Sequence, residues 1–352
     1  MKSPALLTSS RIISDSPIED FDIVLVDGRP LVVCADFSGR DAFSWDPVDD
    51  RWAVHPLDNP CGPNEDDMEL DCLLSIGALV VDGRIVVGGG GYRQPFAQWD
   101  LQTGAVLTYA RDEHGGVART STMELHGRPL FIAGDSSAGS PVRLWDPSQR
   151  DSLTEYEGED WFAINYLAEP IDVCWHRDSI GGLASGMLGG RPVVISSGAD
   201  ACVMVRDVDD MTSVVQFDDA PVPAGGVGMI PVDGRMRVVA AGGTSVLLGD
   251  PDTGTWGECL EFPGDEVDPD EEGILCMDVG VVDGRPIAVT GAKDGTVCLW
   301  DLEGRSLLGA PITEHEDEVF AVRMTEVSNR AVALTAGRDR RIRVWDLDDL
   351  DQ

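Results

Sequence analysis

A segment ending in an aspartate recurs seven times along this chain of 352 residues, and this recurrence limits the possible folds more than any other feature. Its clearest copy, Val281 to Asp301, reads VVDGRPIAVTGAKDGTVCLWD. Asp283 and Gly284 indicate a turn, because Asp and Gly tolerate positive φ, and the flanking short apolar segments alternate as strands do. A hairpin of this size cannot bury its faces alone, so the copies must stack against one another.

The copies share a turn at one end and an aspartate at the other. The turns begin at Asp27, Asp82, His126, Gly189, Asp233, Asp283 and Ser328, and the closing aspartates are Asp46, Asp100, Asp146, Asp207, Asp250, Asp301 and Asp346. Turn and aspartate are 17 residues apart (Asp233 to Asp250) to 20 residues apart (His126 to Asp146). Successive closing aspartates are 43 to 61 residues apart. The hairpin is therefore the constant part, and the connection to the next copy varies in length.

Tryptophan precedes the closing aspartate in most copies. It does so at Trp45, Trp99, Trp145, Trp300 and Trp345, whereas Arg206 and Gly249 stand there in the fourth and fifth copies. This pattern resembles the WD-repeat β-propeller family, in which a repeat of ~40 to 45 residues forms one four-stranded blade. The resemblance implies an all-β fold, a seven-bladed propeller that occupies residues 1–352 as a single domain.

The last blade lacks an outer strand of its own, because only six residues follow Asp346. Residues Pro4 to Ser9 resemble Arg305 to Ala310, the expected outer strand of blade six. As in the family, we expect residues 1–13 to pair into the last blade and to close the ring. This closure would remove an exposed sheet edge.

Two blades carry a hydroxyl, an imidazole and a carboxylate, the groups of a catalytic triad. The sets are His315, Thr335 and Asp339 in blade seven and His176, Ser196 and Asp200 in blade four. In WD-repeat proteins these positions form a structural network with the strand tryptophan, here Trp345; blade six has Thr290, Asp294 and Trp300, with Asp270 in place of the histidine. Because the same residue types recur at repeat spacing, we expect a structural role and no catalytic residue.

Neither a metal nor a cofactor is expected. His55, His114 and His126 have no partners at metal-ligand spacing, and no Cys-x-x-Cys pair occurs among the eight cysteines. The acidic connection from Asp58 to Asp71 lacks the residue order of a calcium-binding loop, which favours a solvated acidic loop.

The formal net charge of −37 restricts the partners. Nucleic acids and anionic membranes would be repelled, and no apolar run reaches the ~18 residues of a membrane-spanning helix. We expect a monomeric cytoplasmic protein that contacts neither. Lys2 and Lys293 are the only lysines, a usage typical of a high-GC bacterial source or of salt adaptation.

The acidic residues concentrate in the connections between blades. In a propeller these connections emerge on the same face as the turns between second and third strands, so we expect one negatively charged face that binds a basic protein or peptide. Salt adaptation is the alternative, and it requires acids on both faces. The candidate partner-binding residues are Phe37, Arg40, Tyr92, Arg93, Phe96, Trp161, Phe162, Tyr166, Asp268, Asp270, Glu271, Arg338 and Arg340.

Residues 154–175 form the longest departure from the repeat, an insertion expected between blades three and four. It carries Trp161, Phe162 and Tyr166 among acidic residues, a composition suited either to a binding element or to a small lid on its own blade.

The main hypothesis is a non-catalytic scaffold for protein interactions. The alternative is an enzyme or small-ligand binder that uses the mouth of the central channel. A pocket there, with clustered carboxylates of shifted pKa from different blades, would favour the alternative.

Overall fold

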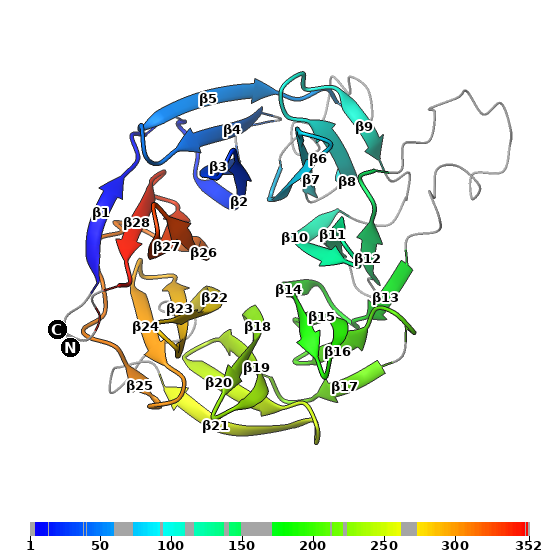
Figure 1. Ribbon diagram of the computed structural model, residues 1–352, viewed down its shortest axis with the longest axis vertical. Helices are drawn as coiled ribbons and strands as arrows, with labels where there is room; N and C mark the ends of the chain where they lie inside the picture. Colours follow the sequence, from blue (N-terminus) through cyan, green and yellow to red (C-terminus); the bar gives the residue numbers. More distant parts are fainter. Residues whose placement is uncertain are drawn as a thin grey trace, which may run out of the picture.

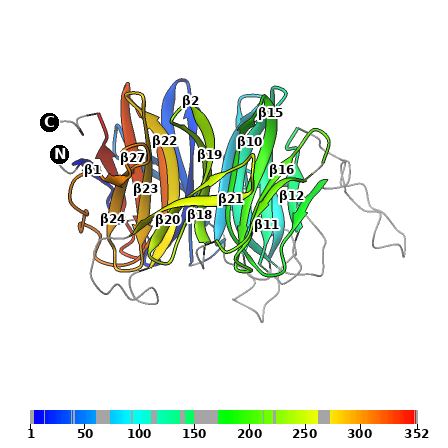
Figure 2. The ribbon, with the colours of Figure 1, turned by 90° about the horizontal axis from the view of Figure 1, so that it is seen from below.

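Seven four-stranded antiparallel sheets stand around a central channel and form a ring (Figure 1). The computed structural model describes residues 4–12, 14–37, 39, 41–59, 73–91, 94–109, 116–136, 141–148, 171–211, 213–220, 224–261, 273–348 and 350. Seen from the side, the ring is a flat disc with the strands running between its two faces (Figure 2). Among the described residues, no helix is long and apolar enough to cross a membrane. The seven-bladed propeller expected from the repeats is confirmed.

In each blade the first strand lies at the channel and the fourth strand lies at the rim (Figure 1). Blades one to three are β2 (Ile18–Val26), β3 (Arg29–Asp36), β4 (Asp41–Asp46) and β5 (Arg51–Pro56); β6 (Ser75–Val81), β7 (Arg84–Gly91), β8 (Gln94–Asp100) and β9 (Val106–Tyr109); and β10 (Val117–Leu125), β11 (Arg128–Asp135), β12 (Pro141–Trp145) and β13 (Ile171–Trp175). Blades four to six are β14 (Ile180–Leu188), β15 (Arg191–Gly198), β16 (Val203–Asp207) and β17 (Ser213–Phe217); β18 (Ala224–Val232), β19 (Arg235–Gly242), β20 (Ser245–Asp250) and β21 (Thr255–Glu261); and β22 (Ile274–Val282), β23 (Arg285–Ala292), β24 (Val297–Asp301) and β25 (Ser306–Leu307). Blade seven is β26 (Val319–Val327), β27 (Arg330–Gly337), β28 (Ile342–Asp346) and β1 (Ala5–Ser9).

The repeated turn joins the first and second strands of every blade. Both of its central residues have positive φ, for example 51° at Asp27 and 75° at Gly28, the geometry of a two-residue type I′ hairpin turn. Even the loosest copy keeps it, with 53° at Ser328 and 62° at Asn329. Asp, Gly and Asn recur at these positions because they adopt positive φ at low cost.

An arginine near this turn pairs with the closing aspartate in each of the seven blades. The pairs are Arg29–Asp46 (3.1 Å), Arg84–Asp100 (3.9 Å), Arg128–Asp146 (3.6 Å), Arg191–Asp207 (2.9 Å), Arg237–Asp250 (2.9 Å), Arg285–Asp301 (3.6 Å) and Arg330–Asp346 (2.5 Å). This ion pair within each hairpin explains why the turn and the closing aspartate are separated by a nearly constant number of residues in the sequence.

The two faces of the disc carry different loops. One face, the turn face, carries the turns that begin at Asp27 and its equivalents and the turns between third and fourth strands, such as residues 302–305. The opposite face, the connection face, carries the connections between blades, such as residues 308–318, and the turns between second and third strands, such as residues 338–341. The channel strands run from the connection face to the turn face.

The apolar core lies between neighbouring blades. One cluster joins Phe21 and Trp45 of blade one to Leu334 and Val344 of blade seven, and another joins Val239 of blade five to strands of blade six. Each blade therefore buries its faces only against its two neighbours, as stacked repeats must.

The N-terminal strand closes the ring, as predicted. β1 pairs with β28 in antiparallel register, with Ala5 opposite Asp346 and Ser9 opposite Arg343. The Ser10 amide donates a hydrogen bond to the Ile342 carbonyl (2.8 Å), which extends the pairing. Figure 1 shows β1 at the rim of the blade that contains β26 to β28.

Blade five replaces its missing tryptophan from another strand. Gly249 stands in the tryptophan position of β20, and the Trp256 ring of β21 packs against Phe217 with ring centroids 4.7 Å apart. A Cβ atom at Gly249 would lie 2.5 Å from Phe217 Cε1 and 3.0 Å from the Trp256 ring. The space that the family's tryptophan fills is thus already occupied.

Restoring the family residue in blade five is therefore expected to destabilise the protein. Gly249→Trp should raise the free energy of the folded state by about 1 to 3 kcal/mol, the usual effect of overpacking. The double variant Gly249→Trp, Trp256→Gly should recover part of the loss, because it removes one of the two rings that occupy the space, while Phe217 remains. Urea unfolding of the two variants and the parent measures both effects, and a stabilised single variant would contradict the explanation.

The insertion is shorter than predicted at its C-terminal end. Residues 171–175, assigned to it from sequence, form β13, which pairs with β12 through Leu144 opposite Ile171 and Pro141 opposite Trp175. The rest of the predicted insertion, residues 154–170, therefore stands in the sequence between the third and fourth strands of blade three and not between blades three and four. The outer-strand pattern of β13 is too short to be recognised beside the long acidic segment. Trp161, Phe162 and Tyr166 lie outside the described residues.

Candidate binding site at the channel mouth

A bulge recurs at the start of the channel strands. The register shifts at Ile18/Asp20, Val117/Arg119, Ile180/Gly182, Ala224/Gly226, Ile274/Cys276 and Val319/Ala321. A bulge places one extra residue against its partner strand and redirects the side chains beside it. The repetition gathers residues from distant parts of the sequence around one end of the channel, on the connection face.

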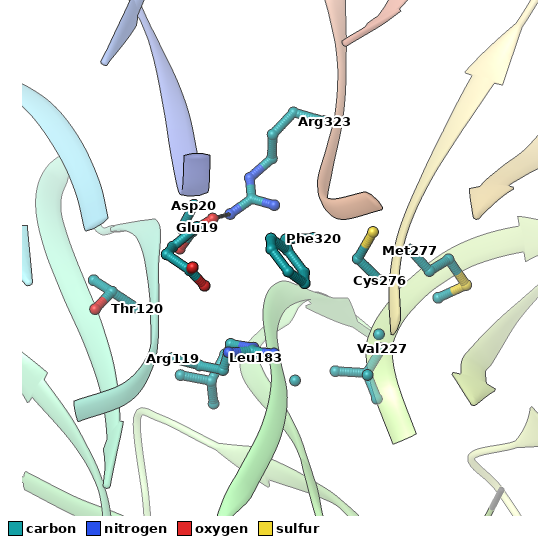
Figure 3. A pocket seen from close by; sticks show the side chains of 13 residues that line it. Glu19, Asp20, Arg119, Thr120, Leu183, Val227, Cys276, Met277, Phe320 and Arg323 are labelled. Atoms are coloured by element: carbon teal, nitrogen blue, oxygen red, sulfur yellow. Dashed lines mark hydrogen bonds and ion pairs between the residues drawn. The ribbon is translucent and has the colours of Figure 1, made fainter. Parts of the chain in front are cut away.

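These residues enclose a cavity of about 50 Å³. Its lining includes two acids, two arginines and one aromatic ring on one side and several small or apolar residues on the other: Glu19, Asp20, Arg119, Thr120, Gly182, Leu183, Gly225, Gly226, Val227, Cys276, Met277, Phe320 and Arg323. Figure 3 shows the side chains of Glu19 and Phe320 extending toward the middle of the opening. Glu19 lies at the bulge of β2 and Phe320 at the bulge of β26.

Asp20 and Arg323 link three blades around the channel. Arg323 of blade seven donates to an Asp20 oxygen at 3.1 Å, and the other Asp20 oxygen accepts from the Ser75 hydroxyl of blade two at 2.7 Å and from the Ile76 amide at 3.2 Å. Arg323 also donates to the Val322 carbonyl at 2.9 Å. Both charges are thus fully engaged, as buried charges must be.

Arg119 is engaged with backbone carbonyls. It donates to the Gly181 carbonyl of blade four and to the Ala118 carbonyl, each at 2.9 Å. The guanidinium therefore joins blades three and four, and its positive charge acts on Glu19 in the cavity.

Glu19 differs from its neighbours, because its carboxylate accepts no hydrogen bond from the described residues. Burial raises the pKa of Glu19 to about 7, the nearby Arg119 opposes this rise, and Asp20 adds to it. The carboxyl therefore changes its charge near neutral pH while its side chain points into the cavity (Figure 3).

Two further carboxylates lie deeper in the channel. Burial raises the pKa of Asp22 to about 6, although its side chain accepts hydrogen bonds from the amides of Ala78 (2.9 Å) and Ile23 (2.8 Å). Burial likewise raises the pKa of Asp278, which accepts from the Met324 amide at 2.7 Å. Each joins its own blade to the next, so both have a structural function in the ring.

Glycines line the opposite side of the cavity because the blades approach closely there. A Cβ atom at Gly225 would lie 2.1 Å from the Leu275 carbonyl oxygen, and one at Gly226 would lie 2.5 Å from Met277 Cβ. Blades five and six could not pack in this way with any larger residue at these two positions.

Cys276, the thiol in the lining, is not an activated nucleophile. Burial raises the pKa of Cys276 to about 12, so its thiol stays protonated and is a poor nucleophile. Within the described part of the chain, no three His, Cys, Asp or Glu side chains lie close enough together to hold a metal ion. The arrangement suits binding of a small group.

The triad-like residues of blade seven form a buried network. Thr335 Oγ1 accepts from Trp345 Nε1 at 2.8 Å and lies 2.7 Å from His315 Nε2, whose Nδ1 lies 3.0 Å from Asp339. The Thr335 hydroxyl already accepts a hydrogen bond from Trp345, and His315 is only 5% exposed. No substrate can therefore reach this hydroxyl. Arg343 also donates to Asp339, at 2.5 Å.

Blades four and six carry partial versions of this network. In blade four His176 Nε2 lies 2.8 Å from Ser196 Oγ and its Nδ1 lies 3.0 Å from Asp200. In blade six Trp300 donates to Thr290 at 2.9 Å, while Asp294 accepts from the Thr296 hydroxyl and amide. Burial and repetition argue for a role in holding strands together in all three blades.

Four of the predicted partner-binding residues can be placed. Phe37 is 50% exposed on the connection face, Arg338 pairs with Glu318 at 2.6 Å, and Arg340 pairs with Asp15 at 3.7 Å. Phe96 is a correction: it is only 3% exposed and packs against Phe131 and Trp145, so it is a core residue. The others lie outside the described residues: Arg40, Tyr92, Arg93, Trp161, Phe162, Tyr166, Asp268, Asp270 and Glu271.

The channel-mouth residues Glu19, Arg119, Phe320 and Arg323 are not among the candidates predicted from sequence. A signal did exist, because Glu19 and Phe320 hold the same position relative to their repeats, one residue before the regular pairing of the channel strand. A charged or aromatic residue at that position stands out beside Ala118, Gly181 and Gly225, which hold it in other blades.

Comparison with known families agrees with the geometry. The sequence model of the family described as WD domain, G-beta repeat, matches residues 267–301 and 308–346, which contain the hairpins of blades six and seven. A comparison with curated proteins gives no match. With two repeats matched by sequence and seven blades built on the same hairpin, the chain belongs to the WD-repeat β-propeller family.

Proposed function

We propose that this protein is a non-catalytic platform that binds a basic protein or peptide on its connection face. WD-repeat propellers serve in general as scaffolds for protein interactions, and the rigid ring offers a broad surface for one. The basic character of the partner is inferred from the distribution of charge.

The acidic connections on the face that also holds the cavity carry this proposal. The turn face is acidic as well: each closing aspartate has an arginine partner there, but its turns add further acids, among them Asp27, Asp49, Asp82, Asp209, Asp233, Asp252 and Asp283. On the connection face the described acids outnumber the bases; the acids include Asp15, Asp178, Asp218, Asp219, Glu314, Glu316 and Asp317, and the bases are Arg177, Lys293, Arg338, Arg340 and Arg341. The connections at 60–72 and 262–272 add further acids in sequence. Such a field attracts basic partners and orients them.

The channel mouth favours a second candidate, a small-ligand binder, because it has a cavity lined by Glu19, whose pKa is raised to about 7. Its size argues against this function. Ligand pockets usually enclose about 300 to 1,000 Å³, whereas this cavity measures about 50 Å³. It can hold one chemical group and not a whole metabolite, so we place it within the interaction surface.

The proposal is tested with a fluorescent octalysine peptide. We expect its affinity to fall at least about threefold between 50 and 200 mM salt, because exposed charges are screened. The double variant Glu314→Lys, Glu316→Lys, which reverses two exposed acids of the connection face, should weaken binding about tenfold.

The matched control changes the turn face by the same charge. Glu303→Lys, Glu326→Lys replaces two exposed glutamates there and should weaken binding less than about threefold. Equal losses in the two double variants, measured by fluorescence anisotropy, would reject a binding face and would leave the acidity as a general property of the surface.

A further inference from the structure

We propose that the channel mouth is an anchoring subsite that takes the ammonium end of one lysine side chain of the partner, with Glu19 as its counter-ion and the Phe320 ring beside it. This inference rests on the proposed function and names the group that the partner inserts.

The two residues come from neighbouring blades that close the ring. Glu19 lies in β2 and Phe320 in β26, strands that lie side by side although about 300 residues separate them in the sequence. Both hold the bulge position, and both extend into the opening (Figure 3). A carboxylate and an aromatic ring facing one cavity are a recurrent arrangement for cation recognition.

A cation fits the cavity better than an anion. Arg323 is paired with Asp20, and Arg119 donates to two carbonyls while its charge acts on Glu19. These two arginines are outnumbered by the four carboxylates at or near the cavity, those of Glu19, Asp20, Asp22 and Asp278. Glu19 is the charged group that lacks a hydrogen-bond partner among the described residues, and Asp20, Asp22 and Asp278 add negative charge around Arg323. A cation would balance the negative charge of the half-buried Glu19 carboxylate.

The size and the number of acceptors favour lysine over arginine. A cavity of about 50 Å³ has room for a few non-hydrogen atoms. An ammonium ion has three donors, whereas a planar guanidinium presents five that all need partners. The unpartnered carboxylate of Glu19 satisfies the smaller group more completely.

Proton release from Glu19 should accompany binding. The charged groups that face Glu19 are Asp20 on its own strand, Arg119 of β10, Arg323 of β26, and Glu318 and Arg338 of blade seven. Below pH 7 the Glu19 carboxyl is largely protonated and attracts the cation weakly, because its pKa in the free protein is about 7. As the pH rises through 7 the carboxylate forms, and affinity should rise until ionisation is complete.

The experiment measures octalysine and octaarginine binding at pH 6 and pH 8 at fixed ionic strength, for the full chain and for Glu19→Gln. For octalysine we expect an increase of about tenfold from pH 6 to pH 8, the change in the ionised fraction of one group with a pKa near 7. Glu19→Gln should bind octalysine more weakly at pH 8 and should lose most of this pH dependence. Octaarginine should show a much smaller pH effect.

The control variant Glu316→Gln removes an exposed acid of the same face and should keep the pH dependence. A pH-independent octalysine affinity in the full chain, or an unchanged pH dependence in Glu19→Gln, overturns the subsite while the face-specific binding of the proposed function can still stand. An equal pH effect for octaarginine overturns the choice of lysine. If the full chain binds no octalysine at either pH, the proposed function itself is rejected.

Discussion

A protein that lacks residues 1–12 should unfold at a much lower urea concentration than the full chain. β1 is the fourth strand of blade seven, and Ser10 ties it further through the Ile342 backbone and the Arg341 side chain. Each lost hydrogen bond costs about 0.5 to 1.5 kcal/mol net, so the loss of the strand costs several kcal/mol. That is a large part of the ~5 to 15 kcal/mol that stabilises a typical domain.

Tryptophan fluorescence during urea unfolding gives the midpoint, and light scattering reports whether the exposed edge of β28 causes association. The matched control is Leu6→Ser, Leu7→Ser, because these side chains are 43% and 41% exposed and the backbone pairing remains. We expect only a small shift for that variant. An unchanged midpoint in the truncated protein would show that β1 contributes little to closing the ring.

The second large effect is expected for Thr335→Val. This substitution keeps the shape of a fully buried side chain but leaves Trp345 Nε1 and His315 Nε2 without their partner. An unsatisfied buried polar group costs about 1 to 3 kcal/mol, so the two together should destabilise the protein by roughly 2 to 6 kcal/mol. Urea unfolding measures this difference in the free energy of unfolding.

Thr120→Val is the matched control for that prediction. Thr120 is also buried, at 3% exposure, but its hydroxyl has no hydrogen-bond partner among the described residues. Removing this hydroxyl should change stability by less than about 1 kcal/mol, because no interaction is lost. Equal losses at the two positions would mean that the volume and not the hydrogen bonds determines the effect, and the structural network would lose its support.

The hairpins could be predicted from sequence because their determinants are local. Type I′ geometry requires residues that accept positive φ, and the sequence supplies Asp-Gly or an equivalent at all seven turns. Closure by β1 also followed from the pattern, since the last repeat lacked a fourth strand. The place of β13 did not follow, because residues 146–170 separate it from the third strand of its blade, whereas only residues 302–305 separate the same two strands in blade six.

The candidate site could be predicted only in part. The acidic connections were visible in the sequence, but Phe96 looked like a surface aromatic and is buried between blades two and three. Glu19 looked like one of many acids. What distinguishes it, the absence of a partner beside a cavity, depends on residues of other blades.

The sequence by itself determined the repeat, the turns, the number of blades and the closing strand, because spacing and turn chemistry act within about twenty residues of one hairpin. The tertiary structure alone decided which side chains meet at the channel mouth. Glu19, Arg119 and Phe320 belong to separate repeats, and their burial, pairing and charge arise only when the ring places their strands around one channel. Residues within each hairpin determine the blades, whereas contacts between blades bring the residues of the site together.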